Sequence, residues 1–319
     1  MIPNVAHLVW MGRKLPFYAG LAIRTAALRG GFDKILLHHT DPLEEEPWWK
    51  DVFDLPGVRR CPLNPTGLLS QVANGRPGLV DGYFALKLPA NRSDLLRAAL
   101  LFLHGGVYLD TDVIVLHAFQ KLLGEGMFLG ANRSVYDYRS SDAGWLSRFG
   151  ARVRSALREG LSRLPDGHRH FRRIQRLYPE HPTTGIWGSA PCHPLLGHVI
   201  DRTAKLLRDR DPDQQDYNAV GPFLVQRVLS EHGWEGVLRL SADYFYPLPP
   251  VIARRWFTPT RRPRLDRILS PRTLAVHWYA SGDVAKSVDG LSFQSIRNQA
   301  SRQLFSAMVL PFLPTGDRG

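Results

Sequence analysis

Short apolar stretches alternate with helical stretches along the first hundred residues, and this alternation restricts the fold more than any other feature of the chain. Residues 5–12, 34–40 and 58–63 have the apolar and β-branched composition of strands. The stretch "PFYAGLAIRTAALRGG" between the first two is helical in composition and ends in a glycine pair, as helices commonly do. Because this alternation is typical of βαβ units, we predict an α/β fold with a mainly parallel central sheet.

The stretch "SDLLRAALLFLHGGVYLDTDVIVL", residues 93–116, continues this pattern but contains two acids. It predicts a helix over 93–104, a glycine turn, and an apolar strand that carries Asp110 and Asp112 toward its C-terminal end or just beyond it. A buried carboxylate is costly unless an opposite charge meets it. The two acids therefore require either lysine or arginine neighbours or a metal ion.

Position and spacing favour the metal ion. In α/β sheets, ligands bind outside the carboxyl ends of the strands. Side chains two apart on an extended chain point the same way, so both acids can face one cation. Their oxygens suit Mg²⁺ or Mn²⁺, whose coordination is completed by water and substrate phosphates. The alternative is pairing with arginines, and the D-x-D spacing alone does not decide, because the polar stretch 209–213 contains it twice.

Asp94 and Arg97 lie three residues apart on the preceding helix, so both can project from one face. By itself, this pair indicates a surface salt bridge worth less than about 1 kcal/mol. Joined through the glycine turn to the acidic strand, the same two residues can reach the cleft of the metal. The combined spacing S-D-x-x-R and G-G-x-Y-x-D-x-D is far more specific than either half.

A long amphipathic helix is predicted over about 142–164, after a strand at 127–132. Its flanks are rich in arginine. Its apolar residues recur every three or four positions: Trp145, Leu146, Phe149, Val153, Leu157, Leu161 and Leu164. The apolar face fits packing on the sheet, and the arginines fit equally an interfacial helix on anionic lipid.

Further strands at 183–190 and 273–279 and helices at 194–208 and 221–232 complete the pattern. No repeat or linker-like stretch interrupts it. We therefore expect a single domain over residues 1–319, with a basic helical insertion at about 142–178.

The charge of the chain indicates a polyanionic partner. The formal net charge is +12 and the sequence pI is near 10, which fits nucleic acid, an anionic membrane surface or nucleotide phosphates. Nucleic acid is disfavoured, because "RHFRRIQR" is basic but belongs to no known nucleic-acid-binding motif. Cys61 and Cys192 form no metal or disulfide pattern, and the sequence shows neither the pattern expected of a signal peptide nor an apolar run of about 20 residues. We predict a cytoplasmic protein, with peripheral attachment to the inner membrane face as an option.

Five sequence blocks together resemble a known enzyme family. "NRSDLLRAALLFLHGGVYLDTDVIVL" resembles the signature of family-32-type glycosyltransferases and of the glucosyltransferase domains of large clostridial toxins. "IPNVAHLVWMG" is similar to their first strand, and "GSAPCHPLL", "VGP" and "AVHWYAS" are similar to later blocks in the family order. The resemblance implies a GT-A fold, a Rossmann-like fold that binds nucleotide sugars.

The resemblance also implies contacts with the donor. Trp10 would stack on the nucleotide base, although a tryptophan in the core is an equally good interpretation of the sequence. Arg97 would contact the sugar diphosphate, Asp94 would accept hydrogen bonds from sugar hydroxyls, and Asp110 would touch ribose or sugar. These last three residues form the expected catalytic set. Lys286 would neutralise the diphosphate, or it is a solvated surface lysine.

For the metal, the resemblance implies Asp112 as a direct ligand, Asp110 at the ion or its water shell, and His277 as a further ligand or a diphosphate contact. A histidine in an apolar strand is also a common core residue. Two departures concern the donor sugar and the closing loop: Thr183-Thr184 stand where the family often has asparagine, and Gly282 stands where tryptophan commonly follows Ser281.

These implications predict a retaining, metal-dependent glycosyltransferase that uses Mn²⁺ or Mg²⁺ and a nucleotide sugar. A UDP-sugar is favoured because Trp10 resembles the tryptophan of the toxin domains. The acceptor would be a glycan, a lipid-linked sugar or another hydroxyl compound, as in polysaccharide biosynthesis. The alternatives are a nucleic-acid-binding protein with a basic helical surface and a non-catalytic module that binds sugar nucleotides. The donor sugar, acceptor and linkage depend on loop shape and are not read from the sequence.

Overall fold

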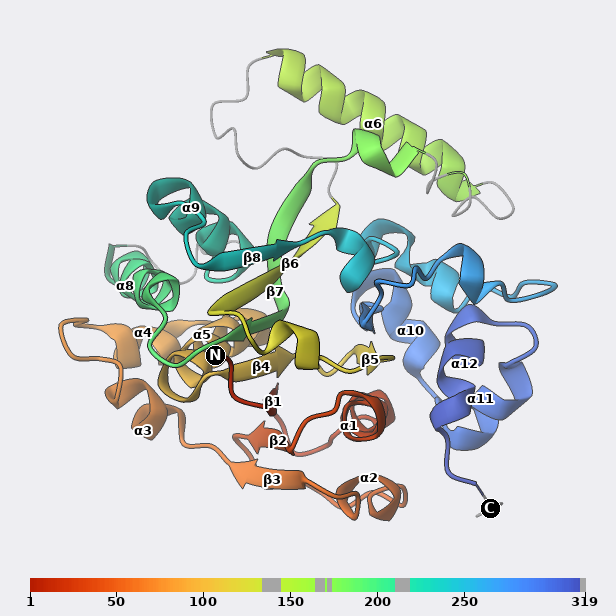
Figure 1. Ribbon diagram of the computed structural model, residues 1–319, viewed down its shortest axis with the longest axis horizontal. Coiled ribbons are helices and arrows are strands. Elements are labelled where there is room, and N and C mark those ends of the chain that lie inside the picture. Colours follow the sequence, from red (N-terminus) through yellow and green to blue (C-terminus); the bar gives the residue numbers. More distant parts are fainter. Residues whose placement is uncertain (134–144, 164–169, 171–173, 210–218, 316–319) are drawn as a thin grey trace.

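The computed structural model describes residues 1–133, 145–163, 170, 174–209 and 219–315. Its central sheet has seven strands in the order β3-β2-β1-β4-β7-β6-β8 (Figure 1). The strands are β1 (Val5–Trp10), β2 (Lys34–His39), β3 (Val58–Pro62), β4 (Gly106–Leu109), β6 (Met127–Arg133), β7 (Glu180–Ser189) and β8 (Val237–Leu240). Only β7 runs antiparallel to its neighbours. The predicted α/β fold with a mainly parallel central sheet is confirmed.

Helices pack against both faces of this sheet (Figure 1). The helices of the described residues are α1 (Phe17–Arg29), α2 (Lys50–Phe53), α3 (Pro65–Ser70), α4 (Leu79–Ala85), α5 (Pro89–His104), α6 (Trp145–Arg163), α8 (Pro194–Asp209), α9 (Pro222–His232), α10 (Ala285–Val288), α11 (Phe293–Gln299) and α12 (Leu304–Val309). None of the helices in the described part of the chain combines the length and apolarity needed to cross a bilayer.

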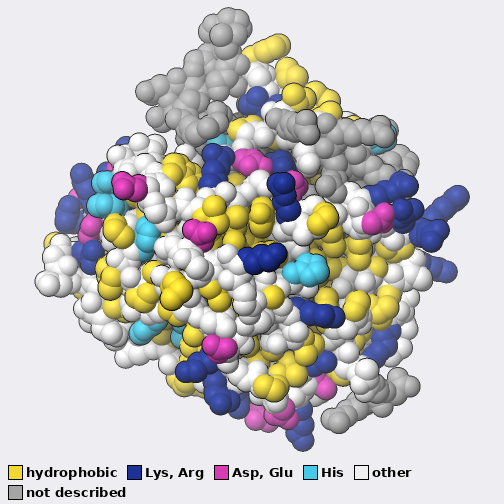
Figure 2. All heavy atoms as spheres, viewed as in Figure 1, with side chains coloured by type: hydrophobic (Ala, Val, Ile, Leu, Met, Phe, Trp, Pro, Cys, Tyr) yellow, Lys and Arg dark blue, Asp and Glu magenta, His cyan; other side chains and the backbone are white. Residues whose placement is uncertain are grey.

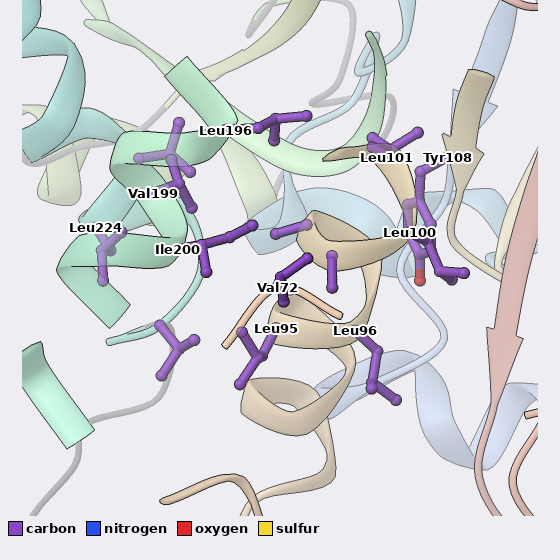
Figure 3. Packing of buried hydrophobic residues seen from close by; sticks show 14 of the residues in the cluster. Val72, Leu95, Leu96, Leu100, Leu101, Tyr108, Leu196, Val199, Ile200 and Leu224 are labelled. Carbon is purple, nitrogen blue, oxygen red and sulfur yellow. The ribbon is translucent and has the colours of Figure 1, made fainter. Parts of the chain in front are cut away.

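Helix α5 is held in the core by its leucines. It begins with Pro89, four residues before the predicted start, because proline is favoured in the first turn of a helix. Leu95 and Leu100 of α5 share a buried cluster with Val199 and Ile200 of α8, and Figure 3 shows Leu100 beside Tyr108 of β4. This packing fixes the rotation of α5 about its axis. The polar residues on the other side of the helix therefore have a fixed direction.

The chain turns from α5 into β4 through two glycines. Gly105 and Gly106 have φ values of +64° and +101°, a region that residues with a Cβ rarely adopt. A Cβ at Gly106 would lie 2.7 Å from the carbonyl oxygen of Val5 and 2.8 Å from Nε2 of His7. The direction of α5 relative to β4 is therefore fixed by a turn that only glycine fits.

The prediction of one continuous strand to residue 116 is wrong, but the predicted position of Asp110 and Asp112 just beyond the C-terminal end of a strand is correct. β4 ends at Leu109, and a separate strand β5 (Val113–Val115) pairs antiparallel with β9 (Ala275–His277) in a second, two-stranded sheet. Residues 110–112 form a turn between the two sheets. Aspartate is disfavoured inside strands, and the turn gives both carboxylates access to the same side without placing them in a ladder.

The basic segment after β6 departs from the prediction as well. Helix α6 forms close to the predicted bounds, but it lies apart from the sheet and its covering helices (Figure 1). Phe149, Val153 and Leu157 are exposed, so packing of this apolar face on the sheet is wrong. Leu164 and the D-x-D sequences at 209–213 lie outside the described residues, apart from Asp209 at the end of α8. The single domain over 1–319 remains a prediction.

Two buried histidines join β1 to β2. Nδ1 of His7 lies 2.9 Å from Nε2 of His38, and the rings stack at a centroid distance of 5.2 Å. Burial lowers the pKa of His7 to about 4 and that of His38 to about 3. Both imidazoles are therefore neutral in the folded protein near neutral pH.

The histidine pair predicts acid sensitivity of the fold. As pH falls from the ordinary histidine pKa of 6.5 to about 4, the unfolded chain binds protons that the folded chain excludes, so stability falls. For His7 alone the loss is about 3 kcal/mol. Urea unfolding across this range should give a shallower pH dependence for His7→Gln than for the parent. The exposed-site variant His117→Gln should keep the parental slope, and equal slopes in all three proteins would refute the assignment.

Candidate functional site

A cavity of about 730 Å³ opens outside the carboxyl ends of β1 and β4, the place where α/β sheets bind ligands. Six predicted site residues line it: Trp10, Asp94, Arg97, Asp110, Asp112 and His277. The seventh, Lys286, is exposed on α10 and does not line the cavity. Residues from β1, α5, the turn at 110–112 and β9 thus meet at one site.

Asp110, Asp112 and His277 form the centre of the site. Each offers one ligand atom, and these three atoms lie within 4.8 Å of one another. Nε2 of His277 is 3.2 Å from Oδ2 of Asp110 and 3.2 Å from Oδ1 of Asp112. The separate β5–β9 sheet produces this meeting, because its register places Val113 directly opposite His277.

The second oxygen of each carboxylate is fixed by the protein. Oδ1 of Asp110 accepts a hydrogen bond from the Tyr108 hydroxyl at 3.1 Å and forms an ion pair with Nη2 of Arg97 at 3.0 Å. Oδ2 of Asp112 accepts from the backbone N–H of Ala280 at 2.8 Å. Such outer contacts orient metal ligands. Each acid therefore points its remaining oxygen at the imidazole.

The electrostatics of the three groups fit a cation. Burial opposes ionisation of Asp110, but the Arg97 guanidinium and His277 hold its pKa below the usual range. Burial raises the pKa of Asp112, and His277 only partly offsets this. Burial also disfavours a charged His277, yet the carboxylates of Asp112 and Asp110 raise its pKa. A divalent cation can replace the proton that these groups otherwise share.

Both sequence interpretations of the acid pair have a part in the structure. Arg97 pairs with Asp110, as the arginine alternative required. Among the described residues, the ion pairs of Asp112 involve His277 alone. The donor set of two carboxylate oxygens and one imidazole nitrogen is one that Mn²⁺ accepts.

Asp94 and Arg97 lie together beside this centre, as their spacing predicted. Oδ1 of Asp94 is 3.5 Å from Nε of Arg97 and accepts a hydrogen bond from the Thr184 hydroxyl at 2.9 Å. Nη1 of Arg97 donates to the carbonyl of Thr184 at 2.8 Å, and its guanidinium lies over the Tyr108 ring. Thr184, a departure from the family pattern, thus fixes both residues.

Two glycines allow the backbone to approach the acids. A Cβ on Gly185 in β7 would lie 2.7 Å from Oδ2 of Asp110, and one on Gly221 would overlap the Asp94 carboxylate. A glycine inside a strand often marks such a close approach. Gly185, a glycine within a strand, therefore indicates this close approach already in the sequence.

Two further cavity residues were not predicted. The Tyr108 hydroxyl remains a donor to Asp110, because burial raises its pKa. Tyr279 has φ of +60°, an unusual conformation for a residue with a side chain, and the next residue is the one whose N–H binds Asp112. Both tyrosines lie within two residues of a predicted ligand.

Comparison of the sequence with known proteins identifies the family of the chain. Residues 7–129 match the family described as "Glycosyltransferase sugar-binding region containing DXD motif". Glucan organizing enzyme 1 of Cryptococcus neoformans var. grubii is 31% identical over 279 residues, which cover 80% of this chain and 67% of that protein. The chain belongs to this glycosyltransferase family. The resemblance seen in the sequence is confirmed. The GT-A fold that it implied is also confirmed, and the observed sheet agrees with it.

More distant similarities extend over most of the chain. Human lactosylceramide 4-alpha-galactosyltransferase is 24% identical over 267 residues, 82% of this chain and 59% of that protein. The chain thus spans 59–67% of the length of these two relatives. A solved structure of the galactosyltransferase LgtC with donor and acceptor sugar analogs is 14% identical, covers 98% of both chains and has a TM-score of 0.45.

The geometry predicts that Mn²⁺ binding depends on the three central residues. Asp112→Asn and His277→Gln should each weaken Mn²⁺ binding by at least ~10-fold, because each removes a ligand atom. Tyr108→Phe, which removes a support of Asp110, should cost about 10-fold. Asp289→Asn changes an exposed acid in the same way and should bind like the parent. Titration followed by the electron paramagnetic resonance of free Mn²⁺ would measure all four, and parental affinity in Asp112→Asn would refute the site.

Proposed function

We propose that this chain is a retaining, metal-dependent glycosyltransferase. It would move a sugar from a nucleotide sugar, with a UDP-sugar favoured, to a hydroxyl group of an acceptor. Family membership supports the reaction class. The observation that carries the proposal is the meeting of Asp110, Asp112 and His277 inside a cavity large enough for a nucleotide sugar.

Asp110, Asp112 and His277 would hold Mn²⁺ or Mg²⁺ through the atoms that face one another. When bound, the cation would supply positive charge that offsets the negative charge on the departing diphosphate. Without it, the three carboxylates around Arg97 would repel a diphosphate, since Arg133, the other arginine of the cavity wall, is paired with Glu180 and Asp243. The acidic side chains grouped in the cavity therefore support a bound metal ion.

Arg97 would act mainly by fixing Asp110. Its guanidinium has five N–H groups, and four of them face Asp110, the Thr184 carbonyl, and the hydroxyl and carbonyl of Ser93. One N–H on Nη1 remains for the donor. We therefore assign Arg97 one contact with the diphosphate and a larger part in holding the metal-binding carboxylate.

Asp94 would bind hydroxyl groups of the donor sugar. Its side chain is 6% exposed and is fixed by Thr184. Trp10 lies at the end of β1 on the cavity wall, with a buried indole N–H that has no partner among the described residues. We assign Trp10 to the nucleotide base. Lys286 remains a proposed diphosphate contact, although its side chain lies outside the cavity wall.

Retention would follow from transfer on one face of the sugar. The bond from the anomeric carbon to the diphosphate oxygen breaks, a bond to the acceptor oxygen forms on the same side, and the acceptor proton passes to the departing phosphate oxygen. A double displacement would instead require a carboxylate nucleophile, and Asp94 is already held by Thr184. Detection of a glycosyl adduct on a carboxylate by mass spectrometry would contradict this mechanism.

The acceptor would be a glycan or a lipid-linked sugar. The name of the human relative describes transfer to lactosylceramide, a sugar carried by a lipid. The cavity continues from the acids to Tyr178, Phe223 and Pro250, which leaves room for an acceptor beside the donor. We favour the lipid-linked class.

Ligand stabilisation tests this proposal. Nucleotide sugars should raise the melting temperature of the parent only with Mn²⁺, and UDP-sugars should give the largest shift. At a ligand concentration near 100 times Kd, stabilisation should reach about 2.7 kcal/mol. Asp112→Ala should lose the shift, and Asp289→Ala should keep it. A shift of equal size in Asp112→Ala would refute the metal-dependent site, and a shift without transfer to any acceptor would indicate a non-catalytic binding module.

A further inference from the structure

Helix α6 carries a stripe of large apolar side chains on its exposed surface. Phe149, Val153 and Leu157 are 61%, 43% and 41% exposed. They are four residues apart, so they lie along one face of the helix. Figure 2 shows hydrophobic side chains at the surface of this part of the molecule. Exposed apolar side chains grouped in this way commonly mark an interaction site.

The opposite face of α6 contacts the protein. Ala151 is 8% exposed, and the carbonyl of Arg154 accepts a hydrogen bond from the Tyr178 hydroxyl at 2.8 Å. The exposed stripe ends at Leu161, four residues after Leu157, because Leu161 packs against the buried cluster that includes Trp256 and Trp278. With 3.6 residues per turn, Ala151 lies across the helix from Val153. The helix is therefore held with its apolar stripe directed away from the body.

Positive charge surrounds the stripe. Arg152 and Arg154 adjoin Val153 in sequence, so they point about 100° to either side of it. Arg152 is exposed and Arg154 is half-buried. The helix contains five arginines and one glutamate, in a chain of net charge +12. An apolar stripe bordered by arginines is the pattern of a helix that lies in the headgroup layer of an anionic membrane.

We propose that α6 docks the protein on an anionic lipid surface, with Phe149, Val153 and Leu157 inserted between the headgroups. This orientation would bring one end of the cavity to the lipid. Tyr178, which holds α6, lines the cavity, and so does Phe223, which is 37% exposed. The acceptor would be a lipid-linked sugar, and this part rests on the proposed glycosyltransferase function. The predicted peripheral attachment to the inner membrane face would have its structural basis here.

A second copy of the chain fits the stripe less well than a membrane does. Stable protein interfaces bury roughly 800 Å² on each partner, far more than three side chains on one helix provide. The helix stands clear of the sheet and its covering layers (Figure 1), so its length can lie on a flat surface. A flat, negatively charged surface complements both the shape and the charge.

Flotation of the full chain with vesicles tests the docking. The parent should float with equimolar phosphatidylcholine and phosphatidylglycerol, remain at the bottom with phosphatidylcholine alone, and detach at high salt. The triple variant Phe149→Gln, Val153→Gln, Leu157→Gln should lower the floated fraction by about 10-fold. A matched control replaces three exposed apolar residues elsewhere, Leu28→Gln, Phe84→Gln, Leu310→Gln, and should float like the parent.

Three results would overturn the docking. They are failure of the parent to float, flotation of the stripe variant like the parent, and a parental dimer in light scattering that the stripe variant separates. The last result would assign the stripe to a second copy. Absence of flotation together with salt-sensitive binding to an acidic protein would assign it to a protein partner.

Stabilisation by a UDP-sugar with Mn²⁺ separates this proposal from the proposed function. The stripe variant should keep that stabilisation, which also shows that it is folded, and should lose transfer only to acceptors embedded in vesicles. If the parent floats but shows no such stabilisation, the docking stands and the proposed function fails. If stabilisation is seen without flotation, the function stands and the docking fails.

Discussion

The interaction on which the site depends is the burial of three carboxylates against one guanidinium. Asp94, Asp110 and Asp112 lie in the cavity wall, and Arg97 contacts the first two. Breaking a buried ion pair leaves an uncompensated charge that costs several kcal/mol. Among the described residues, Asp110 is stabilised by Arg97 and Tyr108, whereas Asp112 is stabilised by backbone N–H groups and His277 and has no arginine or lysine partner. The remaining demand for positive charge supports the proposed metal ion, which would in turn attract the diphosphate.

Several parts of this arrangement could be predicted from the sequence. Acids inside an apolar stretch indicated a ligand, and the i, i+3 spacing placed Asp94 beside Arg97. The division of the stretch after Leu109 could not be predicted, because β-branched residues on both sides of the turn resemble one continuous strand. The role of Thr184 could not be predicted either, since its contact with Asp94 spans 90 residues and no local sequence pattern indicates it.

The orientation of α6 shows a related limit. Periodicity identifies an amphipathic helix, but it does not say which face meets the body. Ala151 supplies the contact face, and Phe149, Val153 and Leu157 supply the exposed one, although Leu161, the next apolar residue of the same spacing, packs against the body. A helix with apolar residues on two sides can direct either side toward the body. The hydrogen bond from the Tyr178 hydroxyl to the Arg154 carbonyl holds α6 in the observed orientation. The same contact connects the surface of the helix to the wall of the cavity.

The most direct test of the central claim is to locate the metal. Crystals grown with Mn²⁺ and UDP, measured at an X-ray energy above the manganese absorption edge, would show the ion as an anomalous difference peak. The account predicts one peak between Oδ2 of Asp110, Oδ1 of Asp112 and Nε2 of His277, the three atoms that already face one another. A peak elsewhere in the cavity, with His277 still donating its proton to the two carboxylates, would contradict it.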